Sequence, residues 1–308
     1  MLLPDRPVLA GVDVRGGAPG TRDTDALDPV NRVDRIDAVV LSGGSVFGLD
    51  AAGALVPWLA TQGRGIAIGS AIVPVVPAAI LFDLTNGGDK RWGLTPPYRA
   101  LGLKAAEAAA RDFALGNAGA GLGATAGRLK GGLGSASVVA DDGLEVGALV
   151  AANPVGSPVM PGQATLWAWA LEQNGEMGGQ PPPSGPISAA ALDLPSDSKL
   201  VANTTIGIVA TNWQLTKADA RRVAIMAQDG IARAVRPAHA PQDGDTIFAI
   251  STGAVPLPEP QHLSIARLGS IAADCVARAI GRAVYLAEPL GGIPSYRQLH
   301  GAKLRQRA

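Results

Sequence analysis

The chain has 308 residues, with 26 basic and 26 acidic side chains and therefore no formal net charge. Hydrophobic residues make up 47% of the sequence, which is enough for a sizeable core and excludes a disordered chain. A balanced charge gives no long-range attraction to nucleic acid or to an anionic membrane. Neither is therefore expected as a partner.

Cysteine and histidine usage bears on cofactors and disulfides. The only cysteine, Cys275, excludes an internal disulfide and a Cys-rich zinc site. There are only three histidines, scattered through the last third of the chain, which argues against a His-dominated metal site; they are His239, His262 and His300. We therefore expect no metal and no cofactor.

Two uncharged stretches, residues 65–82 and 146–171, reach the length of a membrane span. Each contains closely spaced prolines, which break a helix, so both are interpreted as buried strands and loops. The N-terminal residues lack the apolar segment of a secretory signal. We therefore expect a cytoplasmic protein.

The first half of the chain alternates strand and helix patterns. Residues 36–42 form a largely apolar run that predicts a buried strand. Apolar residues at helical spacing predict a helix over 45–56, which Pro57 should end or kink. A second helix is expected over 99–113 and a second buried strand over 144–152.

In the second half, the Gly- and Pro-rich residues 173–188 predict a surface loop. Residues 203–210 predict an apolar strand. A helix then begins at Thr216, with Asp219 as a capping-box partner, and stops before Pro237. A strand over 246–251 and an amphipathic helix over 264–286, with Cys275 on its apolar face, complete the series. No repeat or clear boundary interrupts it, so we expect a single domain over 1–308.

Common catalytic motifs are absent or incomplete. Glycine clusters at 43–44, 119–123 and 131–134 lack the partners of nucleotide-binding loops, so tight turns and close packing explain them better. No G-x-S-x-G nucleophile motif is present. The acidic pair Asp243 and Asp245 lacks the further oxygen ligands of a calcium loop, which leaves a turn or a functional role open.

The junction between Asn203 and Thr204 suggests a different chemistry. A threonine hydroxyl is a weak nucleophile unless a base lies beside it. If Thr204 were N-terminal, its own α-amine, with a pKa of about 8, could serve as that base. Attack of the Thr204 hydroxyl on the Asn203 carbonyl would cut the chain into fragments 1–203 and 204–308. From these residues alone, an ordinary strand start remains the simpler interpretation.

Longer motifs resemble those of the DmpA-type peptidases, also known as the P1 or S58 family, and of the related 6-aminohexanoate-oligomer (nylon-oligomer) hydrolases. They include NTTIGIVATN from residue 203, AGVDVRGGAPGTRDTD at 10–25, VVLSGGSVFGLDAA at 39–52 and KGGLGSAS at 130–137. These motifs follow one another in order over nearly the whole chain. Their order makes the resemblance specific.

The resemblance implies an α+β fold, an αββα four-layer sandwich of the N-terminal-nucleophile type, matured by self-cleavage. It also implies a homo-oligomer, with a tetramer as the expected state. Carried over by motif, Thr204 is the nucleophile, Asn153 can stabilise the oxyanion, and Asp243 and Asp245 position the nucleophile and its amine. The threonine and the paired aspartates resemble the nylon-oligomer branch.

Two positions depart from the family pattern. A family lysine corresponds to Arg128, which keeps the charge but cannot accept a proton; Lys130, two residues later, is the candidate substitute. A tyrosine of some members corresponds to Phe82, which lacks the hydroxyl and is assigned to the substrate-binding region.

The leading hypothesis is an amide hydrolase that cleaves small peptides or linear oligoamides through an acyl-enzyme. A first alternative is an aminopeptidase for β-amino or D-amino acyl peptides. A second alternative, from another class, is an inactive or unprocessed homologue that binds a small molecule.

Overall fold

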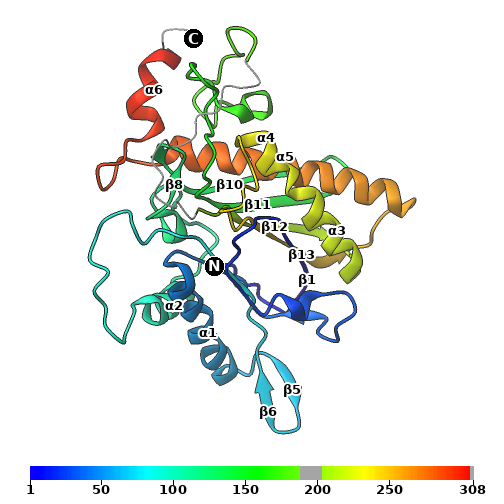
Figure 1. The fold of residues 1–308 in the computed structure, drawn as a ribbon. Helices are drawn as coiled ribbons and strands as arrows, with labels where there is room; N and C mark the ends of the chain where they lie inside the picture. Colours follow the sequence, from blue (N-terminus) through cyan, green and yellow to red (C-terminus); the bar gives the residue numbers. More distant parts are fainter. Residues whose placement is uncertain (188–202, 306–308) are drawn as a thin grey trace.

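The computed structural model describes residues 1–187 and 203–305. Two β-sheets lie between two groups of helices (Figure 1). The helices α3, α4 and α5 cover one side of the strands, and α1 and α2 lie on the opposite side.

The larger sheet has six strands in the order β10-β11-β12-β13-β1-β3. Their bounds are β10 (Gly132–Val139), β11 (Glu145–Ala152), β12 (Ile206–Trp213), β13 (Thr246–Val255), β1 (Val8–Val14) and β3 (Arg35–Ile36). The pair β12 and β13 is parallel, whereas the other neighbours are antiparallel. The central strands therefore begin at the same edge of the sheet.

The smaller sheet has the order β2-β7-β4, and two hairpins and the helices complete the fold. These strands are β2 (Thr21–Arg22), β7 (Ala78–Ile80), β4 (Val40–Ser42), β5 (Ile66–Ile68), β6 (Ala71–Val73), β8 (Thr125–Ala126) and β9 (Leu129–Lys130). The helices are α1 (Asp50–Thr61), α2 (Tyr98–Glu107), α3 (Lys217–Ala227), α4 (Asp229–Ala234), α5 (Gln261–Leu286) and α6 (Tyr296–Arg305).

Three buried apolar clusters separate the layers. Successive side chains of a strand point to opposite faces, and Ile208 and Val209 of β12 accordingly enter different clusters. The Val209 cluster includes residues of α3, α4 and α5, whereas Ile208 lies with residues of the smaller sheet. Ala78 of β7 belongs to the third cluster, with α1 and α2. The order of layers is therefore αββα, and the predicted fold is confirmed.

Small residues allow α5 to pack closely on β10. A Cβ added to Gly134 would lie 1.9 Å from the carbonyl oxygen of Ala279 in α5. At Gly132 it would lie 2.5 Å from the carbonyl oxygen of Ala283, one turn further along. This part of the 131–134 glycine cluster serves close packing, as the sequence predicted.

Several predicted elements are confirmed. The strand over 144–152 is β11, the strand over 203–210 is β12 with a later start, and the strand over 246–251 lies within the longer β13. The long helix over 264–286 lies within α5. At the start of α3, Thr216 and Asp219 form the reciprocal capping box.

Other expectations were wrong in their bounds. Residues 36–42 do not form one strand, because the chain leaves the larger sheet at β3 and joins the smaller sheet at β4. Pro57 does not end α1, which continues to Thr61 while burying Leu55 and Leu59. A proline inside a helix costs about 3 kcal/mol, and each buried leucine contributes about 1.5–3 kcal/mol.

The predicted helices 99–113 and 216–236 also differ from the structure. The first ends at Glu107 as α2, and the residues that follow are exposed, so no core contact extends it. The second is divided into α3 and α4 at Gln228, whose side-chain amide donates to the backbone of Asp13.

The stretches of membrane-span length form strands, turns and loops, as expected from their prolines, apart from one short 3-10 helix at Trp167–Leu171. Over the described residues, no helix combines the length and the hydropathy that crossing a bilayer requires. The predicted loop 173–188 contains no helix or strand as far as residue 187, and its last residue lies outside the described part of the chain.

The close approach of α5 to β10 gives a first prediction. Gly134→Ala should lower the free energy of unfolding by about 1–3 kcal/mol, because the added methyl overlaps the Ala279 carbonyl. Gly147→Ala in β11 is the matched control, since its Cβ would meet nothing closer than 4.0 Å. Denaturant unfolding of both variants measures the difference, and equal stability would contradict this account of the packing.

Candidate active site

The strand order brings two distant segments together at one sheet edge. Because β12 and β13 are parallel with Ile206 opposite Thr246, the residues before them also run side by side. Asn203 pairs with Asp243 in an isolated parallel bridge. The turn that leaves β11 meets the same edge, since Ala151 lies opposite Ile206. Residues 203–205, 243–245 and 153 therefore converge.

Thr204 is held by backbone and side-chain contacts and is only 3% exposed. Its amide N–H donates to the Asn153 carbonyl oxygen at 2.7 Å. Its hydroxyl donates to the carbonyl oxygen of Asn203. The hydroxyl therefore lies against the peptide bond that joins residues 203 and 204.

Gly244 contacts the same carbonyl from the other segment. Its amide N–H donates to the Asn203 oxygen at 3.0 Å. A Cβ at this position would lie 2.8 Å from the Thr204 hydroxyl oxygen and 2.7 Å from the Ala18 carbonyl oxygen. A backbone N–H that donates to a carbonyl oxygen has the geometry required of an oxyanion-stabilising group. Sequence reasoning missed Gly244, although its place between two predicted acids was the available signal.

The two aspartates lie on either side of Gly244, and each accepts hydrogen bonds from a different set of backbone amides. Asp243 accepts from the Val155 amide at 3.1 Å and from the Ala240 amide at 3.0 Å. Asp245 accepts from the Thr205 amide at 2.7 Å. The pair therefore ties the loop after β11 and the segment that carries Thr204 to the segment before β13.

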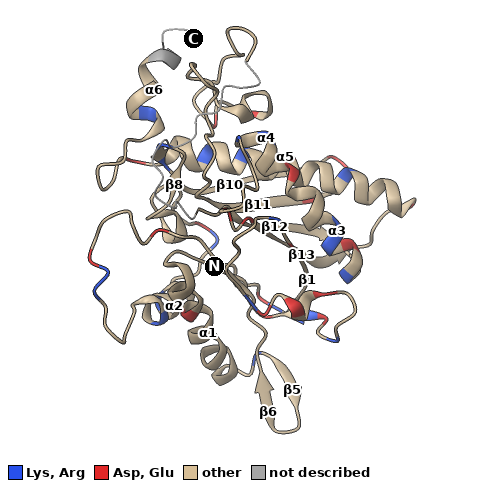
Figure 2. Ribbon diagram, viewed as in Figure 1, with Lys and Arg blue, Asp and Glu red and all other residues tan. Residues whose placement is uncertain are grey.

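The electrostatic setting distinguishes Asp243. Burial, and then the neighbouring Asp245 charge, raise the pKa of Asp243 to about 6, against the amide hydrogen bonds that lower it. The strands β12 and β13, which begin just after these segments, carry no charged residue, as Figure 2 shows. Asp243 therefore titrates closer to neutrality than an exposed aspartate.

Asn153 is fully buried and connects further segments to Thr204. Its side-chain oxygen accepts from the Thr125 amide at 2.7 Å, and its side-chain nitrogen donates to the Phe82 carbonyl at 3.0 Å. Phe82 is half-buried. In this structure the main-chain oxygen of Asn153 contacts Thr204, while the side-chain amide holds the loops around it.

The two basic candidates occupy different places. Arg128 lies on the exposed turn between β8 and β9. Lys130 is 1% exposed, and its ammonium donates to the carbonyl oxygens of Gly121, Ala124 and Gly131 at 2.7–2.9 Å. These three contacts use all three N–H groups of the ammonium.

Burial lowers the pKa of Lys130 to about 8, and the charge of Asp83 opposes this shift. Lys130 pairs with Thr125 in the β8–β9 hairpin, so the ammonium braces a loop that reaches Asn153. Its observed contacts are with backbone carbonyls, not with Thr204.

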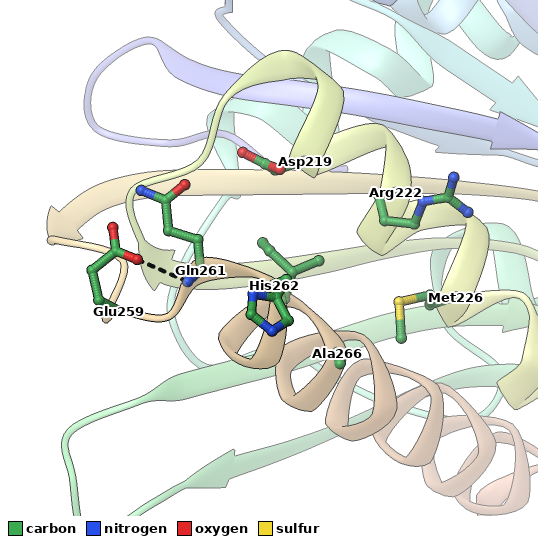
Figure 3. A pocket seen from close by; sticks show the side chains of 8 residues that line it. Asp219, Arg222, Met226, Glu259, Gln261, His262 and Ala266 are labelled. Carbon is green, nitrogen blue, oxygen red and sulfur yellow. Dashed lines mark hydrogen bonds between the residues drawn. The ribbon is translucent and has the colours of Figure 1, made fainter.

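A cavity lies between α3 and the start of α5, away from Thr204 and its neighbours (Figure 3). This cavity of about 740 Å³ is lined in part by Arg222, Met226 and His262, and by none of the predicted site residues. Across residues 1–187 and 203–305, no three or more His, Cys, Asp or Glu side chains are grouped to hold a metal ion.

Comparisons with known proteins agree with the fold. The family model described as Peptidase family S58 matches residues 2–297. An uncharacterized aminopeptidase of Mycobacterium tuberculosis is 44% identical over 310 residues, which cover 97% of this chain and 88% of that protein. A 6-aminohexanoate-oligomer endohydrolase of Agromyces sp. is 29% identical over 283 residues, which cover 87% of this chain and 75% of that enzyme.

Solved structures show the same architecture. The PH0078 protein from Pyrococcus horikoshii matches with a TM-score of 0.71 at 23% identity, covering 99% of this chain and 81% of that one. The L-aminopeptidase D-Ala-esterase/amidase from Ochrobactrum anthropi, described as a variant of the Ntn-hydrolase fold, matches with a TM-score of 0.66 at 22% identity. This match covers 98% of this chain and 81% of that one.

The layers and these structural matches define an N-terminal-nucleophile hydrolase fold. The chain belongs to peptidase family S58 and is an amide hydrolase. The resemblance seen in the sequence motifs is thereby confirmed.

The raised pKa of Asp243 predicts a pH-dependent stability difference. A carboxyl group whose pKa is higher in the folded than in the unfolded state binds its proton more tightly when folded. The stability of the wild type relative to Asp243→Asn should therefore fall as the pH rises from about 4 to about 6, and then stay level. Thermal unfolding of both proteins across this range measures it, and parallel curves would refute the shift.

Proposed function

We propose that the chain is a self-processing amide hydrolase whose nucleophile is the N-terminal Thr204 of the smaller fragment. A single hydrolase domain over 1–308 would be cut into fragments 1–203 and 204–308. One observation carries this proposal: the buried Thr204 hydroxyl and the Gly244 amide both lie against the carbonyl of Asn203.

Self-cleavage would proceed through an ester. The Thr204 oxygen attacks the Asn203 carbonyl carbon, and the hydroxyl proton is transferred to the departing Thr204 nitrogen as the amide bond breaks. The Gly244 N–H, 3.0 Å from the Asn203 oxygen, stabilises the negative charge that develops there. Water then hydrolyses the ester, which gives the Asn203 carboxylate, the free Thr204 hydroxyl and the free Thr204 amine.

In turnover, that amine accepts the Thr204 hydroxyl proton while the oxygen attacks a substrate amide. The substrate amine leaves with a proton, and water hydrolyses the acyl-enzyme. The Asn153 carbonyl already accepts the Thr204 N–H at 2.7 Å, which supports its role in orienting the freed amine. Asp245 would position the nucleophile segment through the Thr205 amide, and Asp243 would assist it. The side-chain amide of Asn153 would contribute to the oxyanion site.

The substrates we propose are small peptides or linear oligoamides such as 6-aminohexanoate oligomers. The 44% identical aminopeptidases and the 29% identical oligomer hydrolases support this range. Aminopeptidase action on β-amino or D-amino acyl peptides is the alternative within the same chemistry. The shape around Phe82 would decide between them.

The nucleophile is tested by mass and by sequence. Wild-type protein should give two pieces, and Edman degradation of the smaller one should begin Thr-Thr-Ile-Gly. Thr204→Ala should remain one chain with no amidase activity, because it lacks the attacking oxygen. Thr204→Ser, which keeps the hydroxyl, is the matched control and should cleave itself. An uncut wild-type chain with full activity would disprove the mechanism.

A substrate panel separates the remaining hypotheses. Purified wild-type protein is incubated with aminoacyl p-nitroanilides of α-, β- and D-amino acids and with a 6-aminohexanoate oligomer. Release from the oligomer alone favours the oligoamide hydrolase, and release from the anilides favours the aminopeptidase. Processing without release from any substrate would favour the inactive homologue.

We also propose a homo-oligomer, in agreement with the tetramer implied by resemblance. The β5–β6 hairpin projects from the body of the protein (Figure 1) and exposes Ile66, Ile68 and Val73, with Ile68 62% exposed. An exposed apolar surface of this kind is typical of an interface.

The hairpin gives a direct prediction for assembly. Ile68→Glu should reduce the mass measured by sedimentation, because a charge would be buried at the contact. Ser70→Glu at the exposed tip of the same hairpin is the control. Equal masses for wild type and Ile68→Glu would place the interface elsewhere.

A further inference from the structure

His239 lies in the segment between α4 and β13, beside the two aspartates. Its backbone has a φ of 54°, in the left-handed region that non-glycine residues seldom adopt. Its ring Nδ1 lies 2.8 Å from Oδ2 of Asp245, and its backbone N–H donates to the same oxygen at 3.2 Å. The side chain is 22% exposed. An unusual backbone conformation thus coincides with two contacts to one buried carboxylate oxygen.

The second oxygen of Asp245 continues this connection toward the nucleophile. Oδ1 of Asp245 accepts from the Thr205 amide at 2.7 Å, and Thr205 directly follows Thr204. A carboxylate held on both oxygens has little freedom to rotate. The position of the Thr205 amide, and with it the start of β12, therefore depends on a group that fixes the other side of Asp245.

The charges of the two aspartates also favour a hydrogen-bond donor at the position of His239. Asp243 and Asp245 are buried within three residues of one another, where two negative charges repel each other. Burial and the Asp245 charge raise the pKa of Asp243, and the neighbouring His239 ring acts in the opposite direction. His239 is therefore placed to offset the negative charge of the pair.

We propose that His239 is a positioning residue for the hydrolytic site: its Nδ1–H donates to Asp245 and so holds the Thr205 amide and the adjoining nucleophile in register. This inference rests on the proposed function, in which Thr204 is the nucleophile. His239 touches neither the nucleophile nor the scissile carbonyl, and it acts through Asp245.

Two substitutions separate the side-chain hydrogen bond from the backbone conformation. Asparagine carries an N–H donor at the δ position, like Nδ1 of histidine, and tolerates a positive φ. Glycine tolerates the same φ but has no donor. His239→Asn and His239→Gly therefore differ in the contact to Asp245 and share the backbone freedom.

The experiment measures kcat and KM of the processed variants with the best substrate from the panel, alongside intact mass. A hydrogen bond to a charged group is worth enough to change a rate about 10- to 100-fold. His239→Gly should lose kcat by that factor with KM changed less than about 3-fold. His239→Asn should recover most of the lost kcat. Accumulation of uncut His239→Gly chain, absent in His239→Asn, would support the same conclusion.

Equal kcat values for the two variants, or a loss confined to KM, would overturn the inference. If His239→Gly does not fold, as judged by circular dichroism, His239→Gln replaces it, because its donor lies one bond further from the backbone. An unprocessed or inactive wild-type protein would instead refute the proposed function. The two failures are therefore distinguishable.

Discussion

The parallel pairing of β12 with β13 is the constraint on which the site depends. These strands are far apart in the sequence, yet their register places residues 203–205 directly beside residues 243–245. The alternative, an antiparallel pair, would put the Asp243–Asp245 segment at the opposite end of β12. The helices α3 and α5 cover the outer face, and the smaller sheet covers the inner one, so this register is held by two apolar clusters. The stability of the layers and the geometry of the site thus have the same origin.

Burial determines how the polar groups of this segment are held. A polar group removed from water must find a partner within the protein, or it destabilises the fold. Here the carboxylates of Asp243 and Asp245 are held by backbone amides, and the Asn203 carbonyl receives two donors. Donors that are already oriented need no rearrangement when charge develops on the carbonyl oxygen. In the proposed mechanism the Gly244 amide is such a donor, so one contact that satisfies a buried carbonyl would also favour attack at this peptide bond.

Local pattern was a good guide where burial is uniform along an element. β11 and α5 follow their predicted bounds because each has a continuous apolar face, and Cys275 is buried on α5 as expected. The local sequence pattern was a poor guide where one apolar run contributes strands to two different sheets. Residues 36–42 are apolar apart from Asp37 and Ser42, which was enough to predict one strand. They nevertheless pass from one sheet to the other, and the apolar pattern does not mark that division. Pro57 similarly shows that core packing outweighs a local helix penalty.

The sequence by itself determined the family, because its motifs follow one another in the family's order. The resemblance in turn implied the order of the layers and named Asn153, Thr204, Asp243 and Asp245, which the structure brings together. Only the tertiary structure decided what those residues contact. It directs the side-chain amide of Asn153 to Phe82, sets the Lys130 ammonium on three carbonyls and brings Gly244 and His239 beside the predicted groups. The physical reason is that a hydrogen bond requires a partner within about 3 Å in a given direction. Such proximity between remote segments arises only when the sheets have formed.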